Sequence, residues 1–128
     1  RSKGMRFLCA EDNELNAEIL TELLKIEGAE CTICENGKRV LETFEQSVPG
    51  DYDMILMDVQ MPVMNGYEAT RQIRALTDPA LSGITILAIT ANAFDEDRKK
   101  VLECGMDGFL SKPIIIEELI DTLQKNLD

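Results

Sequence analysis

The 128-residue chain contains no histidine and no tryptophan, and its only aromatic residues are four phenylalanines and two tyrosines. Without histidine, it lacks the most common metal ligand and general base of proteins, and it cannot itself be a phosphohistidine donor. Because aromatic residues are so few, aliphatic side chains must supply most of the hydrophobic core. The apolar runs are no longer than strands, so the sequence shows neither a transmembrane helix nor the apolar segment of a signal peptide.

Basic residues are also scarce, with 13 Lys and Arg against 24 Asp and Glu, and the formal net charge is −11. We therefore expect no nucleic-acid partner for this domain, because phosphate contacts need a basic surface. An acidic surface is a common aid to solubility, so the charge alone does not identify a function. The length suits one domain, which we expect at residues 5–128, with residues 1–4 as a linker or cloning remnant.

The four cysteines are not expected to form a disulfide framework. Cys31 and Cys34 have the spacing of a redox or zinc-binding pair. In a strand, however, residues three apart point to opposite faces, so these two thiols are not expected to share a metal ion. A redox pair of this spacing is expected at a helix N-terminus instead. We expect buried structural thiols, which suit a reducing cytosol.

Apolar runs alternate with amphipathic stretches five times along the chain. The expected strands are residues 5–10, 30–34, 53–57, 84–89 and 106–110. The expected helices are residues 14–27, 37–47, 66–76 and 95–104, and a last one from Ile116 to Leu127. In the first helix, the spacing of the apolar residues is close to a helical stripe, made by Leu15, Ile19, Leu23, Leu24 and Ile26.

Strict alternation of strands and helices predicts an α/β fold with a parallel sheet covered on both faces. The first, third and fourth strands are almost wholly apolar, as central strands should be, whereas the second contains Glu30 and Thr32 and suits an edge. This favours a flavodoxin-like (βα)5 doubly wound parallel sheet with strand order 2-1-3-4-5, whose switch point lies between strands 1 and 3.

Polar residues stand at the ends of four apolar runs. Glu11 and Asp12 follow the first run, Asp58 the third, Thr90 the fourth and Lys112 the fifth. Taken alone, the acidic pair suits a helix cap, Thr90 a strand end and Lys112 a solvated surface. Since the carboxyl ends of parallel strands meet at one edge, however, all of them are expected to lie together. Three carboxylates, a hydroxyl and an ammonium predict a site for a divalent cation and a phosphoryl group.

Hard cations such as Mg²⁺ take oxygen ligands from one or two carboxylates and several waters. Asp12 and Asp58 suit direct ligands, Glu11 can act directly or through water, and the backbone carbonyl of Gln60 can complete the shell. The cation would reduce the repulsion between Asp58 and an incoming phosphoryl group, which makes the carboxylate a competent nucleophile. The product would be an acyl phosphate on Asp58.

The chain resembles the receiver domain of two-component response regulators, through residues in matching order and spacing: Glu11-Asp12, Asp58, Met61-Pro62, Gly66, Thr90-Ala91 and Lys112-Pro113. The resemblance implies that Asp58 is the phosphoacceptor and that Glu11 and Asp12 bind Mg²⁺. It also implies that Thr90 and Lys112 bind the phosphoryl group. Two residues depart from the commonest pattern, because Glu11 replaces an aspartate and Phe109, at the switch aromatic position, replaces a tyrosine.

Residues 10–16 and 90–94 look most like receivers attached to hybrid sensor histidine kinases. The chain also suits a stand-alone response regulator. The implied partner is a phosphohistidine donor, in a kinase or a histidine phosphotransfer domain. The implied location is cytoplasmic, with no membrane contact by this domain even where its parent is membrane-anchored elsewhere. A weak dimer is left open, and no enzyme activity is expected beyond the domain's own phosphorylation and dephosphorylation.

In the implied mechanism, Thr90 moves toward the new phosphoryl oxygens and Phe109 fills the space that it leaves. The face formed by the fourth helix, the fifth strand and the last helix then changes shape. Three other classes of protein share parts of this pattern. A phosphatase of the haloacid dehalogenase type expects an aspartate where Gln60 stands. A flavin carrier expects a phosphate loop where Glu11 and Asp12 stand. A phosphorylation-independent scaffold is expected to lose members of the set.

Overall fold

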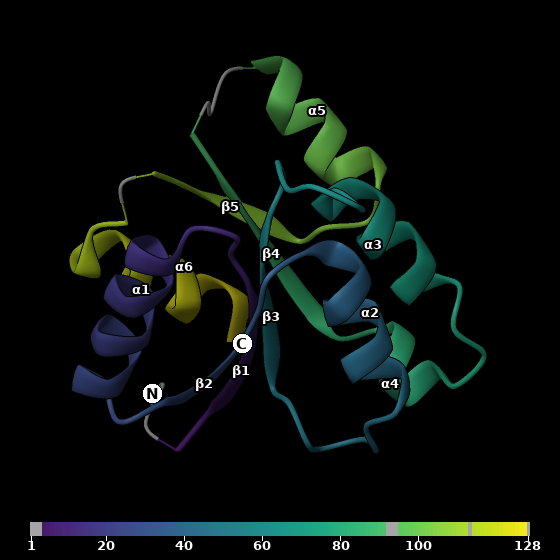
Figure 1. The fold of residues 1–128 in the computed structure, drawn as a ribbon, viewed down its shortest axis with the longest axis horizontal. Coiled ribbons are helices and arrows are strands. Elements are labelled where there is room, and N and C mark those ends of the chain that lie inside the picture. Colours follow the sequence, from purple (N-terminus) through teal and green to yellow (C-terminus); the bar gives the residue numbers. More distant parts are fainter. Residues whose placement is uncertain (1–3, 92–94, 113, 128) are drawn as a thin grey trace.

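The computed structural model describes residues 4–91, 95–112 and 114–127, which form a five-stranded parallel sheet with helices on both faces (Figure 1). The strands are β1 (Arg6–Ala10), β2 (Glu30–Cys34), β3 (Met54–Asp58), β4 (Thr85–Thr90) and β5 (Gly108–Ser111). The helices are α1 (Glu14–Ile26), α2 (Gly37–Glu45), α3 (Gly66–Arg74), α4 (Pro79–Ser82), α5 (Asp95–Glu103) and α6 (Ile116–Leu127). The strand order β2-β1-β3-β4-β5 confirms the predicted flavodoxin-like fold.

Several boundaries differ from the prediction. Asp58 and Thr90 are the last residues of β3 and β4 rather than the first residues after them. The short helix α4 was not predicted, because four residues are too few to show a helical period. Asp78 caps this helix by accepting a hydrogen bond from the Ala80 N–H. Residues 1–3 lie outside the described part, so their assignment to a linker stays a prediction.

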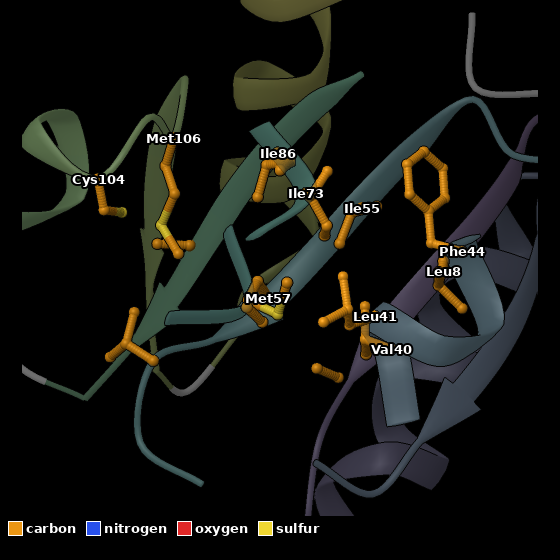
Figure 2. Close-up of a cluster of buried hydrophobic side chains, with 14 of the residues drawn as sticks. Leu8, Val40, Leu41, Phe44, Ile55, Met57, Ile73, Ile86, Cys104 and Met106 are labelled. Carbon is orange, nitrogen blue, oxygen red and sulfur yellow. The ribbon is translucent and has the colours of Figure 1, made fainter. Parts of the chain in front are cut away.

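Two apolar layers enclose the sheet, one on each face. Figure 1 shows α1 and α6 on one side of the sheet and α2, α3 and α4 on the other. In the layer toward α2, α3 and α5, strand residues such as Leu8, Ile55 and Ile86 meet helix residues such as Phe44 and Ile73 (Figure 2). Nearly every residue of β1, β3 and β4 is buried, as predicted for central strands. The buried central strands therefore fix the positions of the residues at their ends, such as Asp58 and Thr90.

The helix predicted from the apolar spacing of α1 is confirmed, but the five residues of the stripe do not share one buried face. Leu20 and Leu24 are the buried residues of this helix, whereas Leu15, Ile19 and Ile26 are 64%, 45% and 72% exposed. Because Leu and Ile occur on more than one face of α1, their spacing alone could not orient the helix. The exposed residues leave an apolar surface on the outside of α1.

Asparagine caps fix where three helices begin. The side-chain oxygens of Asn13, Asn36 and Asn65 each accept a 2.9 Å hydrogen bond from the N–H three residues later, at the start of α1, α2 and α3. Since Asn13 caps α1, the neighbouring carboxylate of Asp12 is not used as the cap. Within the described residues, no helix has the length and apolar character needed to cross a bilayer.

Candidate functional site

Three carboxylates meet at the C-terminal edge of the sheet. One carboxylate oxygen from each of Glu11, Asp12 and Asp58 lies within 4.8 Å of the other two. Asp58 and Glu11 are buried, with 1% and 4% of their surface exposed, whereas Asp12 is exposed. The strand order produces this group, because β1 and β3 are neighbours and end side by side. The predicted clustering of the three acidic residues is confirmed.

Lys112 lies between the two buried carboxylates. Its Nζ donates to Asp58 Oδ2 at 2.7 Å and lies 3.5 Å from Glu11 Oε1. The Gln60 backbone N–H donates to the other oxygen of Asp58, Oδ1, at 3.0 Å. Glu11 Oε2 accepts from the Asn13 backbone N–H at 3.1 Å. Both carboxylates are thus oriented by fixed donors, and oxygen lone pairs remain for a further ligand.

The pKa shifts of Glu11 and Lys112 reflect their burial and the neighbouring charges. Burial raises the pKa of Glu11, and the charge of Asp58 adds to this, while the Asn13 N–H and Lys112 act in the opposite direction. Burial acts to lower the pKa of Lys112, but its hydrogen bond to Asp58 and the charge of that carboxylate raise it overall. Lys112 is therefore held as an ammonium beside the acidic group.

The donor set fits a hard divalent cation. Three carboxylates face one ammonium, so the ionised site carries two uncompensated negative charges, and two of its carboxylates are buried. Burying such charges without a partner is costly. Oxygen-only ligands, one of them exposed to water, match the preference of Mg²⁺ rather than that of zinc.

Close backbone contacts position Asp58 and the loop that follows it. A Cβ at Gly66 would lie 2.3 Å from the Asp58 carbonyl oxygen and 2.8 Å from Met57 Cγ, so only glycine allows α3 to approach β3 this closely. At Gly37, a Cβ would lie 2.5 Å from the Met64 carbonyl oxygen, which accepts a hydrogen bond from the Gly37 N–H. The loop between Asp58 and Gly66 is thereby fixed by the contact of α3 with β3 and by the hydrogen bond from α2.

Thr90 also lies at this edge, as predicted. It is 3% exposed, and its backbone carbonyl accepts a hydrogen bond from the Lys112 N–H at 2.8 Å. Its neighbour Ile89 pairs with Asp58 in the sheet, so Thr90 is one register position beyond the carboxylate strand end. Phe109 lies farther back in β5, is partly buried, and has the Arg98 guanidinium 5.1 Å from its ring centre.

A small cavity next to the carboxylates was not predicted. It has a volume of about 270 Å³ and is lined by Glu11, Asn16, Ile19, Lys112 and Ile114. Two of its residues thus belong to the charged site, while Ile19 belongs to the exposed surface of α1. The only signal in the sequence was that α1 holds more Leu and Ile than one buried face needs.

The fold and the site together define a flavodoxin-like α/β domain with an acidic edge suited to phosphoryl chemistry. Residues 7–124 match the response regulator receiver domain family, and the chain belongs to that family. This membership sets aside the haloacid dehalogenase and flavin-carrier alternatives.

Relatives of two kinds share this domain. The chain is 39% identical over 122 residues to hybrid signal transduction histidine kinase I of Dictyostelium discoideum, covering 91% of the chain but 7% of that kinase. It is 32% identical over 120 residues to the polar-differentiation response regulator DivK of Brucella anthropi, covering 94% of both proteins. The chain therefore spans a small part of the kinases that it matches and nearly all of the stand-alone regulator.

A solved structure of a receiver domain has the same fold. The receiver domain of sensor histidine kinase PA1611 from Pseudomonas aeruginosa, with a magnesium ion coordinated in its active-site cleft, is 37% identical and superposes with a TM-score of 0.84. The match covers 95% of this chain and 96% of that one. The metal belongs to that structure, and it agrees with the donor set found here.

Proposed function

We propose that Asp58 accepts a phosphoryl group from a phosphohistidine on a partner protein. The observation that carries this proposal is the buried Asp58 carboxylate at the end of β3, with the Lys112 ammonium at 2.7 Å and two further carboxylates within 4.8 Å. A strand-end carboxylate with a fixed cation beside it is suited to a nucleophile that meets an anionic group. Membership of the receiver family supports the same role.

The proposed transfer exchanges a phosphorus–nitrogen bond for a phosphorus–oxygen bond. A carboxylate oxygen of Asp58 bonds to phosphorus, and the bond from phosphorus to the histidine nitrogen breaks. That nitrogen keeps the electron pair, and the product is an acyl phosphate. Lys112, which contacts Asp58 before transfer, is placed to hold a phosphoryl oxygen afterwards as a point charge. The Gln60 N–H keeps the carboxyl group oriented during the step.

We assign a Mg²⁺ site to Asp12, Asp58 and Glu11, with the Gln60 backbone carbonyl completing the shell. When bound, the ion supplies positive charge that offsets the repulsion between the carboxylates and the phosphoryl oxygens. The support is the set of three carboxylates and the excess negative charge around Lys112. Because the Glu11 carboxylate is on a longer side chain than an aspartate, it can contact the ion through water.

The signal is proposed to leave through Thr90 and Phe109. Thr90 hydrogen-bonds the new phosphoryl oxygens, and Phe109 moves into the space that it leaves, which reshapes the face of α5, β5 and α6. The buried position of Thr90 at the strand end and the partly buried position of Phe109 support this. A bistable element of this kind needs only a few kcal/mol of differential interaction.

The donor is proposed to dock on the outside of α1. Leu15, Ile19 and Ile33 are exposed apolar residues that line one hollow on this side of the molecule. Ile19 also lines the cavity that contains Glu11 and Lys112, so the surface is continuous with the phosphorylation site. Exposed apolar residues beside a reactive group suit a partner protein that delivers the group, and Glu14, Glu18 and Glu22 surround them in the same hollow.

We propose that the parent is a hybrid histidine kinase, since the 39% identity to one exceeds the 32% identity to a stand-alone regulator. The alternative is a single-domain regulator, which the 94% coverage of DivK supports. In both cases, the proposed location is the cytoplasm, where phosphohistidine is made from ATP. A weak dimer stays a proposal to be tested by the measured mass in solution.

Intact-mass spectrometry after incubation with acetyl phosphate tests the function. We expect the mass of one phosphoryl group to be added in the presence of Mg²⁺ and not after its removal by a chelator. Asp58→Asn should abolish the gain. Asp121→Asn is the matched control, because Asp121 is an exposed aspartate on α6 that pairs with Lys125 on the surface. An equal gain in folded Asp58→Asn would refute the assignment of the acceptor.

A further inference from the structure

Two cysteine side chains meet beneath α1, on the face of the sheet away from Cys34. Cys9 lies in β1 and Cys31 in β2, and the strand register places Cys9 opposite Ile33 and Cys31 opposite Phe7. The two cysteines are therefore on the same face, and their Sγ atoms are 2.9 Å apart. Cys34 lies on the opposite face, 3.7 Å from Thr43 Oγ1 of α2. Cys31 and Cys34 therefore lie on opposite faces of the sheet, as predicted for residues three apart in a strand, and Cys31 lies against Cys9 instead.

The pair has one buried and one reachable sulfur. Cys9 is fully buried, whereas Cys31 is only partly buried at the edge strand of the sheet. The hydrogen bond between Cys31 and Cys9 lowers the pKa of Cys31, against the effect of burial, and the neighbouring Thr21 hydroxyl acts in the same direction. Because the thiolate is the nucleophile, Cys31 is the member of the pair that reacts first with an oxidant from solvent.

We propose that Cys9 and Cys31 are a peroxide-sensitive site that closes to a reversible disulfide. The Cys31 thiolate attacks one oxygen of hydrogen peroxide, the O–O bond breaks, and a sulfenic acid and water form after proton transfer. The Cys9 sulfur then attacks the Cys31 sulfur, the S–O bond breaks, and a second water leaves with the thiol proton. Two thiols are oxidised by two electrons and one peroxide is reduced to two waters.

The disulfide also acts on the phosphorylation site, a part of the proposal that rests on the proposed function. A disulfide needs its sulfurs at about 2.05 Å, so β1 and β2 side chains must approach by about 0.9 Å. Glu11 is two residues beyond Cys9, and its backbone N–H donates to the Cys34 carbonyl at 3.0 Å, the last bond between these strands. The coupling requires that part of this approach is taken up by the backbones of β1 and β2, because such a shift changes the position of Glu11 beside Asp58 and Lys112.

The test treats the purified chain with a small excess of hydrogen peroxide and maps the peptides by mass spectrometry without a reductant. We expect a linked Cys9–Cys31 peptide pair, two hydrogens lighter than its reduced form, that dithiothreitol separates. Phosphoryl uptake from acetyl phosphate should become about tenfold slower in the oxidised chain, as is typical when the support of a metal ligand is disturbed. Dithiothreitol should restore the rate.

Two variants make the result decisive. Cys31→Ser should give no linked peptide and should keep its uptake rate in peroxide, whereas Cys34→Ser should behave as the unmodified chain, because Cys34 lies on the other face. A Cys31 oxidised to sulfinic acid without a linked peptide overturns the site. A linked peptide with unchanged uptake overturns the coupling. If the reduced chain takes up no phosphate but the link forms, the proposed function fails and the disulfide stands.

Discussion

In the proposed transfer, Lys112 contacts the Asp58 carboxylate before the reaction and a phosphoryl oxygen after it. Its ammonium contacts Asp58 and Glu11 in the structure, where a bound cation would also be attracted. Lys112→Met removes the charge but keeps a long apolar side chain. We expect phosphoryl uptake to slow by about 100-fold, because a fixed charge at the transferred group is lost. Mg²⁺ should bind at least as tightly, because a competing cation is gone.

Calorimetric titration with Mg²⁺ and the uptake rate from acetyl phosphate measure these two effects separately. Lys125→Met is the matched control, since Lys125 is an exposed lysine that pairs with Asp121 on the surface of α6. If Mg²⁺ affinity falls in step with the uptake rate, Lys112 only holds the carboxylates in place, and its role in phosphoryl binding is wrong.

Val63 is a residue whose backbone is in an unfavourable conformation. Its φ is 67°, in the left-handed region that β-branched residues rarely adopt, and its side chain is 78% exposed. Val63→Gly removes that strain and loses little buried surface. We expect the free energy of unfolding to rise by about 0.5–1 kcal/mol, measured by urea denaturation.

Val48→Gly is the comparison for this change. Val48 is also largely exposed, at 61%, but its φ is not positive. Glycine there adds only freedom to the unfolded chain, so stability should fall by about 0.5–1 kcal/mol. Equal losses in both variants would show that the conformation of Val63 stores no strain.

At the scale of elements, Arg74 joins four segments that are distant in sequence. From the end of α3, its guanidinium donates to the carbonyls of Ser82, Ile84 and Gly105 and to the Asp107 carboxylate, at 2.6–3.0 Å. The side chain is 23% exposed. It therefore connects α3 to α4, to the start of β4 and to the turn before β5.

Arg74→Lys should lower the free energy of unfolding by about 2–3 kcal/mol, because an ammonium cannot satisfy these divergent acceptors and leaves some of them unpaired. Arg71→Lys, in the same helix, is the control. Arg71 is 59% exposed and pairs with Glu68 on the surface, so its loss should stay within about 0.5 kcal/mol. Urea denaturation of both variants compares them, and similar small losses would contradict the connecting role of Arg74.

The elements also show what the sequence could predict. Asp58 could be assigned to the binding edge because an unbroken apolar run precedes it and a Pro- and Gly-containing loop follows. The Arg74 contacts could not be predicted, because their partners lie 8 to 33 residues away and are mostly backbone carbonyls. The sequence could not show which apolar residues of α1 are buried, for a related reason. Leu20 and Ile19 are equally apolar, and only the packing of the helix on β1 decides which is buried.

At the scale of the whole molecule, the two faces of the sheet have different exposed surroundings. Around α5, α2 and α3, the apolar layer reaches Phe109 of β5, whose ring lies against the Arg98 guanidinium of α5. Around α1, apolar residues remain outside the core and continue to the cavity beside Glu11. The proposed donor surface on α1 and the proposed switch residue Phe109 in β5 therefore belong to different elements, although α6 of the proposed switching face packs on the same side of the sheet as α1.

This separation predicts how surface variants of α1 behave. Leu15→Ala combined with Ile19→Ala removes apolar contact area but keeps good helix formers. Transfer from a phosphohistidine-bearing kinase or phosphotransfer domain should become at least about tenfold slower, as expected for the loss of central apolar contacts. Uptake from acetyl phosphate should be unchanged, because this small donor needs no docking surface.

Ile26→Ala is the control for this double variant. Ile26 is 72% exposed at the far end of α1, away from the site, and its substitution should leave both rates unchanged. A variant that slows both donors equally would show that Leu15 and Ile19 support the site itself rather than a partner.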